Sequence, residues 1–168
     1  MKVPIIFFSG YSNSGKSTLI CRLIERFQTK GYRIAAVKHC RHGISSGEDE
    51  VKDTGRFRSS GARLSITITP NEIVLKGKPV VGNSLSELFY LYKTVDFVFV
   101  EGFKDFCGPR IGVCSFDPKD ELLPPGDYLA IVGDFLPPGY ADTVFFNREQ
   151  IREIADFIEN YFLNSYRF

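Results

Sequence analysis

The sequence predicts a three-layer α/β fold, built on a mostly parallel β-sheet to which an antiparallel β-hairpin is added. An apolar run at residues 3–8 leads into a glycine-rich turn, and apolar residues at helical spacing follow that turn. A second run of large apolar residues, at 96–101, does not alternate with polar residues, which is typical of a strand buried on both faces. Residues 63–69 alternate and precede a turn and a short strand, which indicates a hairpin.

The glycine-rich turn after the first strand matches the phosphate-loop pattern G-x-x-x-x-G-K-[ST]. Glycine lets the backbone turn tightly and bring its N–H groups close to phosphate oxygens. In this pattern Lys16 reaches the terminal phosphates and the Ser17 hydroxyl holds Mg²⁺. The alternative, an ordinary turn with an exposed lysine, would not require a strand before it and a helix after it. The residues predicted to bind the phosphates are Gly10, Ser12, Asn13, Ser14, Gly15, Lys16, Ser17 and Thr18.

The next elements form a β-α-β unit. A helix is predicted at about 15–30, with Gly31 as its C-terminal cap, and a strand at 32–38. A unit of this length implies parallel strands and a right-handed crossover. Residues 39–55 are polar and lack a period, so we expect a mobile loop that faces the ligand from the carboxyl edge of the sheet. A short helix at 54–61 would follow.

The hairpin is predicted as an insertion at about 63–82. It would lie at a sheet edge or project from it, and an edge strand makes it a candidate dimer surface because edge strands offer unpaired backbone groups. Capping-box patterns mark the starts of two later helices. The remaining predicted elements are a helix at 84–93, strands at 96–101, 111–116, 128–132 and 144–146, and a final helix from Asn147.

Length and composition favour a single domain spanning residues 1–168. The chain has a formal net charge of +1 and 43% hydrophobic residues, which gives no indication of a nucleic-acid partner. No apolar run approaches the roughly 20 residues of a membrane span. The four cysteines form no C-x-x-C pair, which favours a reduced, cytoplasmic protein over a disulfide framework.

Two acidic residues are candidates for holding Mg²⁺ or polarising a water molecule. Glu101 ends the second buried run, at a strand end that could lie beside the phosphate loop. Asp53 belongs to the polar stretch after the second strand. The alternatives are an exposed strand-end carboxylate and a solvated charged loop. The candidate metal ligands are therefore Ser17, Asp53 and Glu101, and the candidate catalytic residues are Lys16, Asp53 and Glu101.

Four further residues are candidate nucleotide contacts. Arg56 could face phosphate or an anionic partner, because guanidinium groups bind phosphate well. His39 and Lys104 lie just at or after strand ends, where they are candidate anion contacts. No Asn-Lys-x-Asp string is present, so guanine recognition has to come from another segment. Asp134, which follows the last buried strand, could accept hydrogen bonds from a guanine edge.

A set of short motifs carries a family resemblance from residue 3 to about 115. Besides the phosphate loop, the motifs are Val37-Lys38-His39 with His42, Lys52-Asp53-Thr54 with Arg56, Gly61-Ala62, and Glu101-Gly102-Phe103-Lys104 followed by Pro109-Arg110-Ile111. In this order they resemble the molybdopterin-guanine dinucleotide biosynthesis adapter family, MobB. The chain departs from the family pattern at Val51, where glycine is usual, and at Arg110, where lysine is usual.

The resemblance implies a P-loop NTPase fold that binds GTP with Mg²⁺, hydrolyses it slowly and dimerises through added β-structure. It also implies that the chain assists the guanylyltransferase that builds the dinucleotide form of the molybdenum cofactor. Molybdopterin molybdenumtransferase is a second candidate partner, and molybdopterin is a candidate ligand. Lys16 and Ser17 would take the phosphate and magnesium roles, while Asp53 and Glu101 lie where the family places acids near the metal.

The alternative function is a small-molecule kinase or ATP-dependent ligase on the same scaffold. A kinase needs a lid that brings several arginines over the transferred phosphoryl group. Between Glu101 and the last buried strand the chain has only Arg110, which favours the adapter. A stand-alone regulatory GTPase is a third possibility, which the missing guanine string disfavours.

Overall fold

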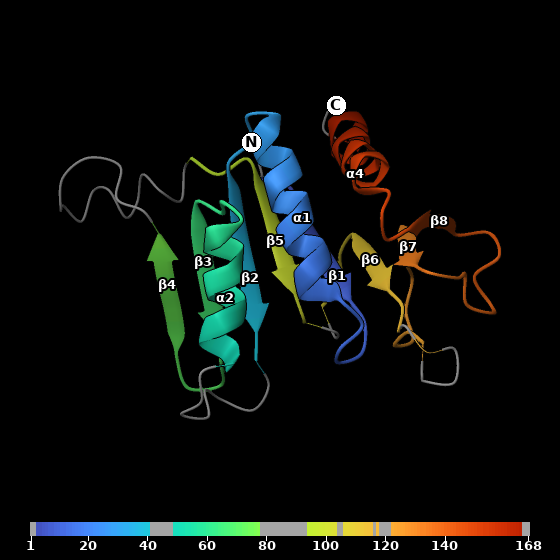
Figure 1. Ribbon diagram of the computed structural model, residues 1–168, viewed down its shortest axis with the longest axis horizontal. Helices are drawn as coiled ribbons and strands as arrows, with labels where there is room; N and C mark the ends of the chain where they lie inside the picture. Colours follow the sequence, from blue (N-terminus) through green and yellow to red (C-terminus); the bar gives the residue numbers. More distant parts are fainter. Residues whose placement is uncertain are drawn as a thin grey trace.

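The computed structural model describes residues 3–40, 49–77, 94–103, 106–115, 117 and 122–165, with the backbone alone for 49–53 and 164–165. In these residues eight strands form one sheet, against which helices pack (Figure 1). The predicted helix at 84–93 and the far end of the hairpin lie outside the described residues. From one edge to the other, the strands are β4 (Ile73–Gly77), β3 (Leu64–Ile68), β2 (Ile34–His39), β5 (Phe97–Glu101), β1 (Ile5–Ser9), β6 (Arg110–Val113), β7 (Ala130–Gly133) and β8 (Val144–Asn147).

All neighbouring strands are parallel except β3 and β4, which form the predicted hairpin. Leu64 lies opposite Gly77 at one end of the hairpin, and Ile68 lies opposite Ile73 at the turn. The hairpin lies at the sheet edge, the first of the two positions predicted for it. Its first strand pairs in parallel with β2, so the hairpin extends the main sheet. The predicted fold class, a mostly parallel α/β sheet with an added hairpin, is confirmed.

The main core lies between the sheet and α1 (Lys16–Thr29). The apolar residues that predicted this helix face the sheet and are at most 5% exposed: Leu19, Ile20, Leu23, Ile24 and Phe27. The Phe27 ring packs edge-on against Phe97 and Phe99, at centroid distances of 4.9 and 5.2 Å. Because strand side chains alternate between faces, Phe7 belongs to a second apolar cluster on the other side of the sheet.

Helix α2 (Asp49–Ser59) corrects one prediction. The polar stretch was expected to remain a loop until residue 54, but its last part is helical from Asp49. Thr54 and Phe57 are 4% and 0% exposed, and they lie one turn apart on the side of α2 that packs against α1 and the neighbouring strands. With so few apolar residues, the stretch showed no helical period, so the sequence did not reveal this helix start.

Helix α4 (Ile151–Ser165) starts four residues later than Asn147, where the sequence placed it. Asn147 is the last residue of β8 and pairs with Gly133 of β7, so it cannot be helical. The predicted capping contact nevertheless forms, because the Asn147 N–H donates to Gln150 Oε1 at 2.7 Å. The Asn147 side chain accepts from the Glu149 N–H at 3.1 Å. The capping residues therefore shape the turn between strand and helix.

The parallel strands bring distant residues to one edge of the sheet, at the bottom of Figure 1. The phosphate loop follows β1 at this edge. In the register of the sheet, Glu101 at the end of β5 lies between Phe8 of β1 and Lys38 of β2. The end of β5 is therefore fixed beside the loop, as its predicted role requires.

The cysteines carry no disulfide bond, as expected: Cys21, Cys40 and Cys114 are buried and Cys107 is exposed. Burial raises the pKa of the Cys114 thiol to about 11, so this thiol is protonated and unreactive at neutral pH. In the part of the chain that the structure describes, no helix has both the length and the apolar character needed to cross a bilayer.

Candidate nucleotide-binding site

The phosphate loop has a backbone that only particular residues permit. Asn13 and Gly15 have positive φ angles of 61° and 90°, a region that glycine enters freely and asparagine more easily than most residues. A Cβ on Gly10 would lie 2.3 Å from the carbonyl oxygen of Val113 and 2.7 Å from the Ser14 hydroxyl. Because Gly10 has no Cβ, its backbone can lie close to both Val113 of β6 and Ser14 of the loop.

Lys16 lies across the loop that it follows. Its ammonium group donates to the carbonyl oxygen of Tyr11 at 2.5 Å and to the Ser14 hydroxyl at 3.4 Å. The loop itself is closed by a hydrogen bond from the Ser14 N–H to the Tyr11 carbonyl, at 3.3 Å. These contacts hold a positive charge over the loop backbone, where the phosphates of a nucleotide would lie.

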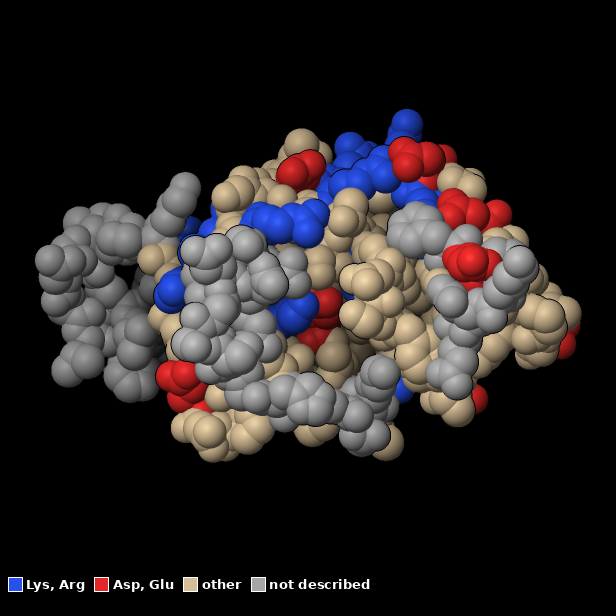
Figure 2. All heavy atoms as spheres, turned by 60° about the horizontal axis from the view of Figure 1, so that its bottom comes forward, with Lys and Arg blue, Asp and Glu red and all other residues tan. Residues whose placement is uncertain are grey.

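A cavity of about 530 Å³ opens beside the loop. Figure 2 looks toward this edge of the sheet and shows a hollow with acidic atoms inside and Lys and Arg atoms beside and above it. The cavity is lined by Ser12, Asn13, Gly15, Lys16, Ser17, Thr18, Leu19, Arg22, Lys38, Arg56, Glu101, Val132, Arg148 and Glu149. Most of the predicted loop residues thus share one cavity with Glu101 and Arg56.

Glu101 is the acid at the bottom of this arrangement, and it is 5% exposed. Its two carboxylate oxygens lie 3.0 and 2.9 Å from the Ser17 hydroxyl, which donates to them. The Lys38 ammonium donates to the same carboxylate at 3.0 Å and balances its charge. A buried carboxylate beside a serine hydroxyl supplies the hard oxygen ligands that Mg²⁺ prefers. The residues present therefore fit a magnesium ion next to the phosphates.

The other predicted contacts differ in how they relate to the cavity. Arg56 reaches from α2 to α1, where its guanidinium donates to the Thr18 hydroxyl at 3.1 Å. The His39 ring stacks on Phe103 with a centroid distance of 4.1 Å, and neither residue lines the cavity. Lys104 lies outside the described residues. Asp53 lies within α2, but its side chain is not described.

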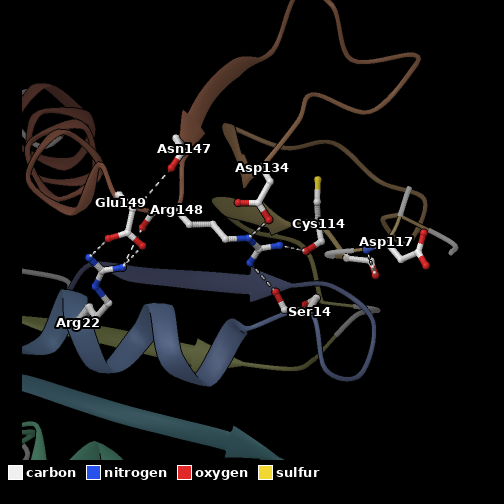
Figure 3. A network of polar contacts seen from close by, with 9 residues as sticks. Ser14, Arg22, Cys114, Asp117, Asp134, Asn147, Arg148 and Glu149 are labelled. Carbon is white, nitrogen blue, oxygen red and sulfur yellow. Dashed lines mark hydrogen bonds and ion pairs between the residues drawn. The ribbon is translucent and has the colours of Figure 1, made fainter. Parts of the chain in front are cut away.

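Asp134, the predicted guanine contact, forms an ion pair with Arg148 at 3.0 Å and does not line the cavity. Arg148 lies in the turn between β8 and α4, and it contacts the phosphate loop directly (Figure 3). Sequence reasoning missed Arg148 and its neighbour Glu149, as well as Arg22 on α1. The capping pattern around Arg148 indicates only a helix start, and Arg148 is 134 positions from Ser14, so only the folded sheet brings the two together.

Comparison with known proteins identifies the family. The model of the family "Molybdopterin guanine dinucleotide synthesis protein B", MobB, matches residues 5–134. The chain belongs to the MobB family. Among curated MobB relatives, the "Molybdopterin-guanine dinucleotide biosynthesis adapter protein" of Haemophilus influenzae is 30% identical over 164 residues, which cover 95% of this chain and 90% of that protein. A probable adapter protein of Bacillus subtilis is 31% identical over 135 residues, covering 77% and 75% of the two chains.

Solved structures agree with this assignment. A crystal structure titled as molybdopterin-guanine biosynthesis protein B has a TM-score of 0.52 and 29% identity, and the match covers 94% of this chain and 97% of that one. HypB from Helicobacter pylori has a TM-score of 0.60 at 12% identity, with 99% and 90% of the chains covered. At such low identity the HypB likeness shows the fold alone. The MobB family and HypB therefore share the predicted P-loop fold.

Proposed function

We propose that this chain is a GTP-binding adapter in the biosynthesis of molybdopterin guanine dinucleotide, and that it binds GTP together with Mg²⁺. The proposed binding of GTP and Mg²⁺ is supported above all by the contact between Ser17 of the phosphate loop and the buried carboxylate of Glu101. Family membership supports the adapter part, because curated relatives of this length carry that name.

In this proposal the loop backbone and Lys16 bind the phosphates, while Ser17 and Glu101 hold the metal ion. The bound Mg²⁺ would neutralise phosphate charge. Once Mg²⁺ also binds the Glu101 carboxylate, the Lys38 ammonium group would be balanced less by that carboxylate and would attract the phosphates. Asp53 remains a candidate for the metal and for hydrolysis, because α2 also carries Arg56 into the cavity. Hydrolysis by such a site is expected to be slow.

The partner proteins follow from the same proposal. The guanylyltransferase that forms the dinucleotide is the first candidate, with molybdopterin molybdenumtransferase as the second and molybdopterin as a ligand at the contact between proteins. We also expect a homodimer that uses the hairpin edge formed by β4. A cytoplasmic location is consistent with the need for GTP.

Titration calorimetry with GTP and ATP, with and without Mg²⁺, tests the nucleotide site. We expect wild-type protein to prefer GTP by about tenfold or more, and Mg²⁺ to strengthen binding. Lys16→Ala should abolish measurable binding without changing the fold. Glu101→Gln, which keeps the shape and removes the charge, should remove most of the gain that Mg²⁺ provides. Arg152→Ala, whose side chain is 78% exposed on α4, is the control.

Two results would contradict these assignments. Unchanged GTP affinity in Lys16→Ala would place the nucleotide elsewhere, and an unchanged Mg²⁺ effect in Glu101→Gln would remove Glu101 from the metal site. GTP turnover measured alone and with candidate small-molecule acceptors then separates the adapter from a kinase. An acceptor-dependent rate many times above the basal rate would favour the kinase and refute the adapter.

A further inference from the structure

Arg148 links three separate segments around the phosphate loop, and it lies beyond residues 5–134, which the family model matches. Its guanidinium donates to the Ser14 carbonyl of the loop at 2.7 Å and to the Cys114 carbonyl, just after β6, at 2.5 Å. It also donates to the Asp134 carboxylate, just after β7, at 3.0 Å. Figure 3 shows the side chain extending from the β8–α4 turn to all three acceptors.

These contacts are sheltered from water. The side chain of Arg148 is 13% exposed, and Ser14 and Cys114 are fully buried. Hydrogen bonds from a charged donor are stronger than neutral ones. Removing the donor costs free energy, because the buried carbonyl oxygens lose that hydrogen bond. The contact to Ser14 is therefore a firm restraint on the loop.

The restrained carbonyl belongs to the Ser14–Gly15 peptide, next to the cavity that Gly15 lines. Because a trans peptide is planar, the carbonyl of Ser14 and the N–H of Gly15 point in opposite directions. When Arg148 holds the carbonyl on the β8 side of the loop, the Gly15 N–H is turned away from Arg148. Gly15 lines the cavity and has a φ of 90°. Rotation of the Ser14–Gly15 peptide changes the φ of Gly15, and glycine permits a wide range of φ, so an external restraint fixes a backbone that could otherwise rotate.

The backbone of Arg148 is itself anchored to the helix that follows the loop. Arg22 of α1 donates to the Arg148 carbonyl at 3.2 Å and forms two hydrogen bonds to Glu149, at 3.0 and 2.7 Å. The side chains of Arg22 and Glu149 are 38% and 77% exposed, so this ion pair contributes little stability on its own. Its effect is to keep the β8–α4 turn at a fixed distance from α1.

We propose that Arg148 is a positioning residue of the nucleotide site, which sets the Ser14–Gly15 peptide so that its N–H faces the phosphates. Asp134 acts through Arg148, by orienting the guanidinium, and does not contact the base. The proposal rests on the proposed nucleotide site. It assigns a role in phosphate binding to the C-terminal part of the chain, which carries no phosphate-binding motif of its own.

The test compares Arg148→Ala, Arg148→Lys and the control Arg152→Ala, whose side chain is 78% exposed on α4. Affinities for GTP and ATP are measured by calorimetry below the melting transition of each variant. We expect Arg148→Ala to lose about tenfold or more in affinity for both nucleotides alike, because the lost contact concerns phosphates. Arg148→Lys should recover part of the loss, and Arg152→Ala should stay within about twofold of wild type, as surface changes generally do.

A double-mutant cycle tests the role of Asp134. If Asp134 acts only through Arg148, Asp134→Ala lowers affinity in the wild-type background and has no further effect in Arg148→Ala. A loss confined to GTP, in either variant, would instead show base recognition and overturn the proposal. Wild-type affinity in Arg148→Ala would overturn it as well.

The amide signal of Gly15 in the nuclear magnetic resonance spectrum of the ligand-free protein gives a readout that does not depend on nucleotide. It should shift in Arg148→Ala and stay in place in Arg152→Ala, and an unshifted signal in both would contradict the positioning role. Wild-type protein that binds neither nucleotide would contradict the proposed function, and the Gly15 signal would still decide whether Arg148 sets this peptide.

Discussion

At the scale of single residues, glycines decide whether the phosphate loop can form. Gly10 lies so close to the carbonyl of Val113 that a Cβ would overlap it, at 2.3 Å. Gly15 needs its positive φ to turn the chain into α1. The motif predicted both glycines from their spacing, and the structure adds the neighbour that makes Gly10 necessary.

Replacing Gly10 tests this close approach. We expect Gly10→Ala to lower the free energy of unfolding by about 1–3 kcal/mol, because the contacted atom belongs to the backbone and cannot move freely. The control is Gly55→Ala in α2, where the nearest atom to a new Cβ is Arg58 Nη2 at 4.0 Å. This control should gain up to about 1 kcal/mol, since alanine favours a helix over glycine. Urea denaturation measures both, and equal midpoints for the two variants would contradict the steric argument.

At the scale of elements, α4 is tied to α1 by a polar cluster at the end away from the loop. The Lys30 ammonium donates to Asp156 at 2.6 Å and to Glu159, and the Tyr32 hydroxyl donates to Glu159 at 2.5 Å. Lys30 lowers the pKa of Asp156 through its hydrogen bond. Burial opposes ionisation of Glu159, but the hydrogen bonds from Lys30 and Tyr32 outweigh it and lower the pKa of that carboxyl as well.

This cluster predicts a loss of stability in acid. Both carboxyls have lower pKa values in the folded protein, so their contribution is fully present above the ordinary values of 4.5 and 3.8. It is lost as the pH falls below those values, because protons then favour the unfolded chain. Lys30→Met should therefore flatten the fall in melting temperature between about pH 5 and pH 3, relative to Lys76→Met. Parallel melting curves across this range in both variants would rule out the cluster as the cause.

The three described helices show what local sequence patterns can and cannot predict. The helix after the loop was predicted closely, because its apolar residues recur at helical spacing from Leu19 to Phe27 and are buried. The start of α2 was missed, because apolar residues are too sparse in residues 49–59 to show a helical period, and the buried Thr54 and Phe57 lie in its second half. The start of α4 was misplaced at Asn147, because the capping residues there serve a turn after β8.

At the scale of the whole molecule, the strand order assembles the candidate site. Ser17 follows β1, Glu101 ends β5, Lys38 lies in β2, and Arg148 follows β8, yet their side chains reach one cavity. Such a site couples ligand binding to global stability, because the nucleotide would contact segments from both halves of the sheet.

Nucleotide should therefore stabilise the entire fold. At a GTP concentration one hundred times its dissociation constant, linkage predicts a gain of about 2.7 kcal/mol. For a chain of this size that gain raises the melting temperature by about 5–10 °C. Differential scanning fluorimetry with Mg²⁺ and GTP measures the shift, and Lys16→Ala should abolish it. The same shift in wild type and Lys16→Ala would show that the stabilisation comes from another site.

The sequence by itself determined the family, the phosphate loop, most strands and the acid at the end of β5, because these depend on local periods and on motifs with fixed spacing. Only the tertiary structure decided that Glu101 meets Ser17 and Lys38, and that Arg148 restrains the loop while Asp134 pairs with it. The reason is that the order of parallel strands depends on long-range packing, which no window of neighbouring residues contains.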